Sequence, residues 1–277
     1  MATARELIRD ASKELEESSL DPTLDAQILL AEILETTRTH LLLIDKISDA
    51  DISKFKEFIN RRKNCEPIQY ITGRAYFRNL IVDVGPGVLV PRPESEGLVT
   101  AVIDAISMLA NPKVLDLGAG SGALGIALAE EVPGATVYSV EKDAGAFGWL
   151  ERNVAKSRAS IKTIHSDVVD FDGQGLFDAV IANPPYIPSS SNLNDLPEEV
   201  GKFEPAIALF GGEEGLDGPR LFIDCAIRSL HSGGYLAIEH HESHGEQIAL
   251  LLKRDCLDVT LHYDLNGRPR WSSGVRR

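Results

Sequence analysis

The sequence has few basic residues for its length. Its 28 lysines and arginines stand against 42 acidic residues, which gives a formal net charge of −14 at pH 7. Proteins that hold long nucleic acids usually present a basic face to the phosphates, so this balance favours a protein or a small molecule as substrate. We interpret the densest basic cluster, residues 61–63, as a solvated helix end, with a docking patch as the alternative.

Cysteines and long apolar runs are also scarce. Cys65, Cys225 and Cys256 lie far apart, without CxxC spacing or paired histidines, so we expect reduced thiols, no disulfide and no metal site. No apolar run approaches the roughly 20 residues that cross a bilayer. The polar amino terminus lacks the apolar stretch of a signal peptide. These absences predict a cytoplasmic protein that does not bind a membrane.

The first part of the chain has helical periodicity. Apolar residues recur at i, i+4 and i+7 between residues 24 and 31, and Ile52, Phe55, Phe58 and Ile59 form a second apolar stripe with helical spacing. Asp21-Pro22 and the acidic residues 49–51 are typical of helix starts. From Tyr76 the pattern changes to short apolar runs around a turn, which predicts a β-hairpin. We expect a helical domain over residues 1–72 and a linking hairpin over 73–92.

The remainder, residues 93–277, alternates apolar runs with helical patterns. The predicted strands cover residues 114–117, 136–140, 161–165, 179–182, 235–239 and 259–264. Alternating strands and helices indicate an α/β domain with a parallel sheet covered on both faces. Residues 188–217 lack periodicity and are long for a connection, which is typical of a functional loop or of disorder.

A glycine-rich turn follows the first of these strands. The run Val114-Leu-Asp116-Leu-Gly118-Ala119-Gly120-Ser121-Gly122 leads directly into a helical pattern. Glycines allow positive φ and let a ligand approach the backbone, and open α/β sheets bind ligands at the carboxyl ends of strands. Glu141 ends the second strand and can accept hydrogen bonds from two ribose hydroxyls. A nicotinamide cofactor stays possible here, because Gly118-x-Gly120-x-x-Ala123 also satisfies the dinucleotide fingerprint.

Two details favour a different cofactor. Asp116 in the form Asp-Leu-Gly-x-Gly-x-Gly resembles the first motif of class I methyltransferases, and we expect it to hold the glycine loop and approach the amino-acid portion of S-adenosylmethionine. Asp167, followed by Val168, closes the third strand, where that fold places an acid near the adenine. The resemblance therefore implies the class I S-adenosylmethionine-dependent methyltransferase fold, a Rossmann-like, mostly parallel seven-stranded sheet, with a small helical domain before it.

The fourth strand ends in Asn183-Pro184-Pro185-Tyr186, which we call the clamp. Two prolines fix two φ angles, and a residue before proline is held extended. The side-chain oxygen of Asn183 and the carbonyl of Pro184 can then accept both N–H groups of one planar NH2 group, while Tyr186 offers a flat face. Holding a weakly nucleophilic amide in line with a methyl donor supplies orientation. This clamp resembles amino-methyltransferases that act on adenine N6, cytosine N4 or glutamine N5.

The flanking sequence narrows the resemblance to one family. Pro67-Ile-Gln-Tyr70-Ile-Thr-Gly73, Phe77 and Leu89-Val-Pro91-Arg92-Pro93-Glu94-Ser95-Glu96 resemble the HemK/PrmC family of peptide chain release factor glutamine methyltransferases. Gly233-Gly234-Tyr235-Leu236-Ala237-Ile238-Glu239-His240 and the ending from Tyr263 to Arg270 also fit. The sequence departs from the family pattern at three positions. Aspartate is more usual at the position of Glu141, threonine is common at that of Ser95, and an acidic residue is frequent at that of Tyr76.

The resemblance implies methylation of the glutamine in the Gly-Gly-Gln loop of class 1 release factors, with S-adenosylhomocysteine as by-product. It implies that residues 1–72 recognise the substrate, that Phe77 walls the substrate pocket and that Arg92 braces the domain junction. The implied catalytic and substrate-binding residues are Asn183, Pro184, Pro185 and Tyr186. The implied cofactor residues are Asp116, Gly118, Ala119, Gly120, Ser121, Gly122, Glu141, Asp167, Val168 and Asn183. We interpret Asp264, Arg268 and Arg270 as a structural terminal hairpin.

Four other functions stay open. Within the same chemistry, the substrate could be a glutamine of a ribosomal protein or adenine N6 in nucleic acid, although this acidic chain shows no basic cleft. A nicotinamide dehydrogenase would need a partnered catalytic side chain, and His240 and His241 have no evident partner. A cofactor-binding module without catalysis would not need the intact clamp. We therefore expect a protein partner and no direct binding of nucleic acid.

Overall fold

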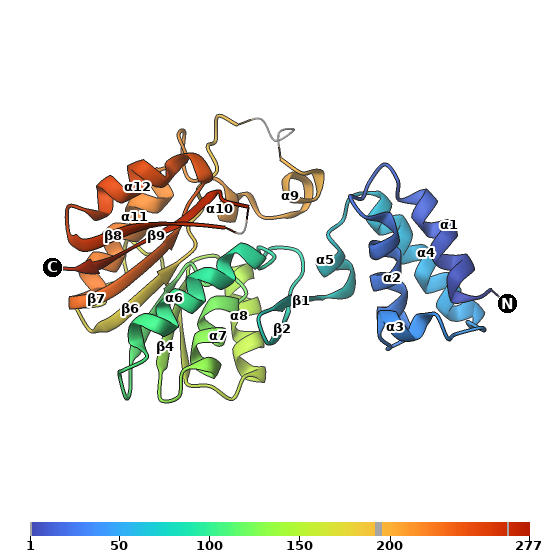
Figure 1. The fold of residues 1–277 in the computed structure, drawn as a ribbon, viewed down its shortest axis with the longest axis horizontal. Coiled ribbons are helices and arrows are strands. Elements are labelled where there is room, and N and C mark those ends of the chain that lie inside the picture. The colour runs from blue at the N-terminus through green and yellow to red at the C-terminus, as the bar shows by residue number, and fades with distance from the viewer. Residues whose placement is uncertain (1, 192–195, 265) are drawn as a thin grey trace. The chain divides into compact units, whose positions relative to one another are not determined.

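The computed structural model describes residues 2–191, 196–264 and 266–277 (Figure 1). The described residues form two compact units. The smaller unit contains the chain up to Arg74 together with Leu196–Phe203, and the larger unit contains the rest. Sequence analysis places residues 196–203 in the domain that covers 93–277, whereas their contacts group them with the helical unit. Two segments that are distant in sequence therefore build the smaller unit.

The smaller unit is helical. Its helices are α1 (Ala4–Glu14), α2 (Pro22–Ile33), α3 (Arg38–Leu41), α4 (Asp49–Lys63), α5 (Ile68–Thr72) and α9 (Glu198–Phe203). The carboxylate of Asp21 accepts a hydrogen bond from the Leu24 amide at the start of α2, and the Ser48 hydroxyl caps α4 in the same way. The two predicted helix starts are thus confirmed. Leu15, Leu29, Leu30 and Phe55 lie in its core.

The interpretation of residues 61–63 as a solvated helix end is wrong for Arg62. This side chain is buried, and its guanidinium contacts Asp25 at 2.7 Å and Glu199 of α9 at 2.8 Å. Arg61 pairs with Glu66 at 2.6 Å. The sequence pattern could not reveal the two partners of Arg62, because Asp25 and Glu199 lie far from Arg62 along the chain.

The larger unit is built on a seven-stranded sheet. Its strands are β3 (Lys113–Leu117), β4 (Thr136–Glu141), β5 (Ile161–His165), β6 (Phe177–Ala182), β7 (Leu230–Glu239), β8 (Cys256–Tyr263) and β9 (Pro269–Arg276). The strand order is β5-β4-β3-β6-β7-β9-β8, parallel except that β9 runs antiparallel to both neighbours. The separate hairpin consists of β1 (Arg74–Phe77) and β2 (Leu80–Asp83). The predicted fold class is confirmed.

Helices cover both faces of this sheet (Figure 1). One face carries α6 (Glu96–Ile106), α7 (Ala123–Glu131) and α8 (Ala144–Lys156), and the other carries α11 (Asp217–Ser229) and α12 (Gly245–Leu252). The short helices are η1 (Pro93–Ser95), α10 (Ala206–Leu209) and η3 (Glu242–His244). Strand residues such as Leu115, Val180 and Leu236 are fully buried between the layers, as expected for a parallel sheet.

The prediction of a long aperiodic loop differs from the structure, whereas the prediction of a structural terminal hairpin agrees with it. Residues 192–195 of the aperiodic segment 188–217 lie outside the described residues, and the described part contains α9 and α10, which are too short to show a helical repeat. The terminal hairpin is present as β8 and β9, and Asp264 accepts hydrogen bonds from the amides of Asn266 and Arg268 in its turn. Its carboxylate also pairs with Arg270 at 3.0 Å. These residues therefore have a structural role in the turn.

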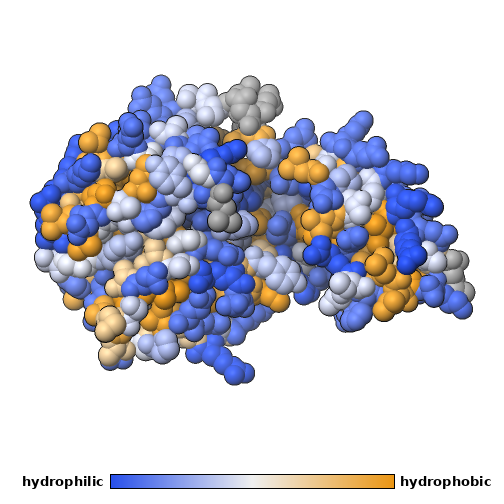
Figure 2. Space-filling view, in the orientation of Figure 1, coloured by the Kyte–Doolittle hydropathy of each residue, from blue (hydrophilic) through white to orange (hydrophobic). Residues whose placement is uncertain are grey.

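The surface agrees with the acidic composition. Hydrophilic residues predominate on the visible face of the larger unit, with small apolar areas between them (Figure 2). Among the described residues, none of the helices has the length and apolar character that crossing a membrane requires.

Candidate active site

The glycine turn after β3 is built from left-handed backbone. Gly118, Gly120 and Gly122 have φ values of +68°, +55° and +85°. Residues other than glycine are strained in this region of backbone conformation. The amides of Gly118 and Ala119 donate hydrogen bonds to the carbonyl of Val140 on the neighbouring strand. A Cβ atom on Gly118 would lie 2.8 Å from the ring of Phe222. The turn therefore presents bare backbone at the carboxyl end of the sheet.

Asp116 lies beneath this turn and is 1% exposed. Its carboxylate accepts a hydrogen bond from the amide of Gly125 in the first turn of α7, at 3.1 Å. Burial, with a smaller contribution from the charge of Glu141, raises the pKa of Asp116 to about 7. Asp116 thus holds the start of α7. It does not line the cavity described below, so its approach to a cofactor stays a prediction.

Glu141 connects the second strand to the glycine turn. One carboxylate oxygen accepts from the amide of Gly120 at 2.9 Å, and the other accepts from the amide of Asp143 at 2.8 Å. These two bonds fix the orientation of the carboxylate. Each oxygen has a further lone pair, so Glu141 can still accept hydrogen bonds from two hydroxyl groups in the cavity.

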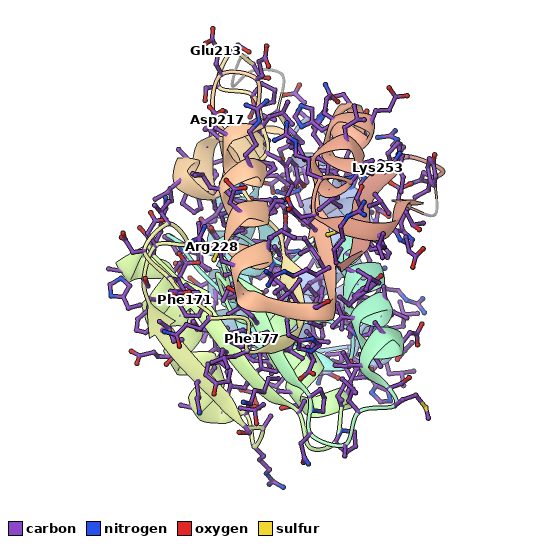
Figure 3. The ribbon with its side chains drawn as sticks, turned by 90° about the vertical axis from the view of Figure 1, so that its left-hand side faces the viewer. Phe171, Phe177, Glu213, Asp217, Arg228 and Lys253 are labelled. Atoms are coloured by element: carbon purple, nitrogen blue, oxygen red, sulfur yellow. The ribbon has the colours of Figure 1, made fainter. Side chains whose placement is uncertain are left out.

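The segment after β5 is held by a residue that the sequence analysis missed. Arg228, near the end of α11, donates hydrogen bonds to the carbonyls of Val168 and Phe171, at 3.1 and 3.4 Å. Figure 3 shows Arg228 and Phe171 near the lower end of that helix and Asp217 at its upper end. The neighbouring Asp167 faces Lys142 across 3.5 Å. Arg228 thereby positions the predicted adenine-binding segment.

A cavity of about 310 Å³ opens at this edge of the sheet, within the size range of small-molecule sites. It brings together predicted residues from four strand ends, namely Gly118, Ala119, Gly120, Ser121, Glu141, Asp167, Val168, Asn183 and Pro185. Five other predicted residues do not line it, namely Asp116, Gly122, Pro184, Tyr186 and Phe77. Phe77 is buried in β1, and its role in a substrate pocket stays a prediction.

The clamp begins where β6 ends, beside the glycine turn. Its backbone is closely packed by glycines of the following segment. A Cβ atom on Gly211 or on Gly218 would lie 2.3 Å from the carbonyl oxygen of Pro185, and one on Gly215 would lie 2.3 Å from that of Tyr186. These glycines are therefore required for the observed path of the clamp.

The side chains of the clamp enter a hydrogen-bond network. The Asn183 amide nitrogen lies 3.4 Å from the Ser95 hydroxyl, which donates to Glu239 at 2.5 Å. The hydroxyl of Tyr186 donates to the other oxygen of Glu239 at 3.0 Å. Within the described parts of the chain, no hydrogen bond reaches the Asn183 side-chain oxygen or the Pro184 carbonyl oxygen. Both oxygens are therefore available as acceptors.

Ser95 and Glu239 were missed as site residues in the sequence. Both lie in segments quoted for the family resemblance, and Glu239 follows the apolar residues Leu236-Ala237-Ile238 at the buried end of β7, which is an unusual place for a carboxylate. Arg92 also lines the cavity and pairs with the buried Glu204 at 2.5 Å, which fixes the segment leading into α10. The sequence signal that could have identified Glu239 was a charged residue at the end of a predicted buried strand.

The histidines weighed for hydride chemistry do not reach the cavity. His240 is fully buried, and its ring contacts the Ser272 hydroxyl and the His241 carbonyl. Burial lowers the pKa of His240 to about 4. Neither His240 nor His241 lines the cavity, so neither supplies the side chain that a dehydrogenase would need.

Comparisons with known proteins agree with this geometry. Residues 6–73 match the family model of the PrmC N-terminal domain, and residues 95–199 match that of the Methyltransferase small domain. A release factor glutamine methyltransferase of Streptomyces coelicolor is 40% identical over 257 residues, covering 91% of this chain and 90% of that protein. One from Bifidobacterium longum is 36% identical over 295 residues, covering 98% of each.

A solved structure shows the same fold. The 16S rRNA N2 G1207 methyltransferase of T. thermophilus, in complex with AdoMet and guanosine, superposes with a TM-score of 0.54 at 21% identity. The match covers 74% of this chain and 50% of that chain. At this identity the likeness concerns the fold alone.

Proposed function

The chain belongs to the family of release factor glutamine methyltransferases, and we propose that it methylates glutamine N5 in the Gly-Gly-Gln loop of a class 1 release factor. S-adenosylmethionine is the methyl donor, and S-adenosylhomocysteine is the product. The observation that carries the proposal is that Asn183 and Pro185 line the same cavity as the glycine turn and Glu141. Donor and acceptor groups would therefore meet inside one site.

The residues of the cavity fit S-adenosylmethionine. Backbone without a Cβ atom at Gly118 and Gly120 suits close approach of the amino-acid portion, and a Cβ atom at Gly118 would collide with Phe222. Glu141 offers carboxylate oxygens to the ribose hydroxyls, and Asp167 and Val168 would hold the adenine. When bound, this cofactor supplies an electrophilic methyl group on a sulfonium.

The clamp prepares the glutamine for methyl transfer. The side-chain oxygen of Asn183 and the carbonyl of Pro184 accept the two N–H groups of the amide, which fixes the plane of the NH2 group. The same two acceptors favour the positive charge that develops on nitrogen. Restricting the amide to one orientation reduces the entropic part of the barrier. Pro184 and Pro185 keep these acceptors in place because their φ angles are fixed.

The smaller, helical unit would recognise the body of the release factor. The net charge of −14 supports a protein substrate over a long nucleic acid. We also infer that the protein acts in the cytoplasm, where its substrate is found. These parts of the proposal rest on the family and on the net charge.

Incubation with labelled S-adenosylmethionine and a purified class 1 release factor tests the proposal directly. We expect label on the Gly-Gly-Gln glutamine, mapped by mass spectrometry, and none when that glutamine is replaced by alanine. Purified ribosomal proteins and an adenine-containing DNA duplex serve as competing substrates. Methylation of either competitor, with none on the release factor, would overturn the assignment.

A further inference from the structure

Glu239 occupies an unusual position for a carboxylate. It ends β7, directly after Ile238, which pairs with Ala182, the residue before the clamp. The side chain is 2% exposed and does not line the cavity. A buried charge is costly unless hydrogen bonds compensate for it. The described contacts of Glu239 therefore indicate what keeps a carboxylate there.

Two hydroxyl groups donate to Glu239, and both belong to the surroundings of the substrate amide. Ser95 donates to Oε2 at 2.5 Å, and Tyr186 of the clamp donates to Oε1 at 3.0 Å. Burial raises the pKa of Glu239, while these two hydrogen bonds act in the opposite direction. Both carboxylate oxygens of Glu239 therefore act as acceptors, and each of the two hydrogen bonds runs from a hydroxyl to the carboxylate.

The direction of the hydrogen bond from Ser95 to Glu239 also determines the orientation of the Asn183 side-chain amide. The Ser95 hydroxyl has one hydrogen, which it gives to Glu239, so its lone pairs must accept from the next group. The group facing it is the Asn183 side-chain amide, 3.4 Å away. Only the NH2 end of that amide can donate. The side-chain oxygen of Asn183 therefore points away from Ser95 and stays available to the substrate.

We propose that Glu239 is a positioning residue of the clamp, acting through Ser95 on the orientation of the Asn183 amide and directly on Tyr186. The inference rests on the proposed function, because it concerns the same glutamine amide. Reversal of the Asn183 amide would present NH2 to the substrate NH2, and neither group could accept. Glu239 thus selects the one orientation in which the clamp binds an amide.

Glu239→Gln tests this mechanism with little change in shape. A glutamine side chain has one acceptor oxygen and one donor nitrogen, so it cannot accept from both Ser95 and Tyr186. We expect kcat for release factor methylation to fall by about 10- to 100-fold, as for other misplacements near a reacting group. We expect KM for the release factor and the Kd of S-adenosylmethionine to change less than about threefold. Glu246→Gln, an exposed position on α12, is the matched control.

The Ser95 variants separate positioning from packing. Ser95→Ala removes the link to Asn183 and should reduce kcat as Glu239→Gln does, whereas Ser95→Thr retains the hydroxyl and should recover most of that loss. The kcat of the double variant Glu239→Gln/Ser95→Ala should lie within about threefold of the kcat of the slower single variant. The reason is that the effects of substitutions at coupled residues are not additive. If Glu239→Gln does not fold, the Ser95 pair decides alone.

The outcomes are distinguishable. Wild-type protein that fails to methylate the release factor overturns the proposed function. Wild-type methylation with a normal kcat in Glu239→Gln, or equal kcat in Ser95→Ala and Ser95→Thr, overturns the positioning role and leaves the function standing. Multiplicative losses in the double variant also contradict the shared pathway through Ser95.

Discussion

Replacing Asn183 with alanine removes one of the two acceptors that the clamp offers to an amide. Removing one preorganised polar group of this kind typically costs about 10²- to 10³-fold in rate, and we expect such a loss in single-turnover methylation. Pro184 and Pro185 still shape the turn, so calorimetry should find cofactor affinity within about tenfold of wild type. Asn183→Asp keeps acceptor oxygens but adds a buried charge, and should also be inactive. Near-normal turnover by the alanine variant would exclude the clamp mechanism.

Asp116 should make stability depend on pH. Its folded-state pKa of about 7 exceeds the unfolded value, so between these values the folded state binds more protons, and stability falls as pH rises. Asp116→Asn removes this contribution. From pH 5.5 to 7 the variant should gain about 2 kcal/mol relative to wild type, at about 1.4 kcal/mol per pH unit. Urea unfolding followed by tryptophan fluorescence measures this, because both tryptophans, Trp149 and Trp271, lie in the larger unit. A pH-independent difference would contradict the raised pKa.

The start of α11 supports the clamp through a residue without a side chain. A Cβ atom on Gly218 would lie 2.3 Å from the Pro185 carbonyl oxygen, so Gly218→Ala must displace one of the two segments. We expect turnover to fall by about tenfold or more, because small misplacements near reacting atoms are costly. Gly148→Ala in α8 is the control. Nothing lies within 4 Å of its Cβ position, and alanine should stabilise that helix by up to about 1 kcal/mol. Equal activity of the two variants would show that Gly218 does not position the clamp.

Elements that depend on local sequence signals could be predicted from the sequence, whereas contacts between distant segments could not. The strands β3 to β6 and the starts of α2 and α4 were predictable, because apolar runs and capping residues are local signals. The short helices α9 and α10 were not, since they have too few residues for a helical repeat. The clamp and the glycine turn were recognised as motifs. The network through Ser95 and Glu239 was missed because its members come from segments 88 and 144 residues apart, and only the fold brings them together.

Arg62 tests the integrity of the smaller unit. It is the buried partner of Asp25 and Glu199, and removing one member of a buried ion pair typically costs about 3–5 kcal/mol. Arg62→Ala should therefore lower the unfolding midpoint of the helical unit in far-ultraviolet circular dichroism. The tryptophan transition of the larger unit and the affinity for S-adenosylmethionine should stay unchanged. Arg5→Ala, an exposed position on α1, is the control. A parallel shift of the tryptophan transition would show that the two units unfold together.

The origin of α9 has a consequence for synthesis on the ribosome. The helical unit needs Leu196–Phe203 for completion, yet roughly 130 residues are translated between the end of its first segment and the end of its second. At typical elongation rates this interval lasts on the order of ten seconds. During this interval Arg62 can pair with Asp25 but not with Glu199, which has not yet been translated. The nascent amino-terminal bundle should therefore mature late, only after most of the parallel sheet has been translated, and protease sensitivity of stalled nascent chains would record that delay.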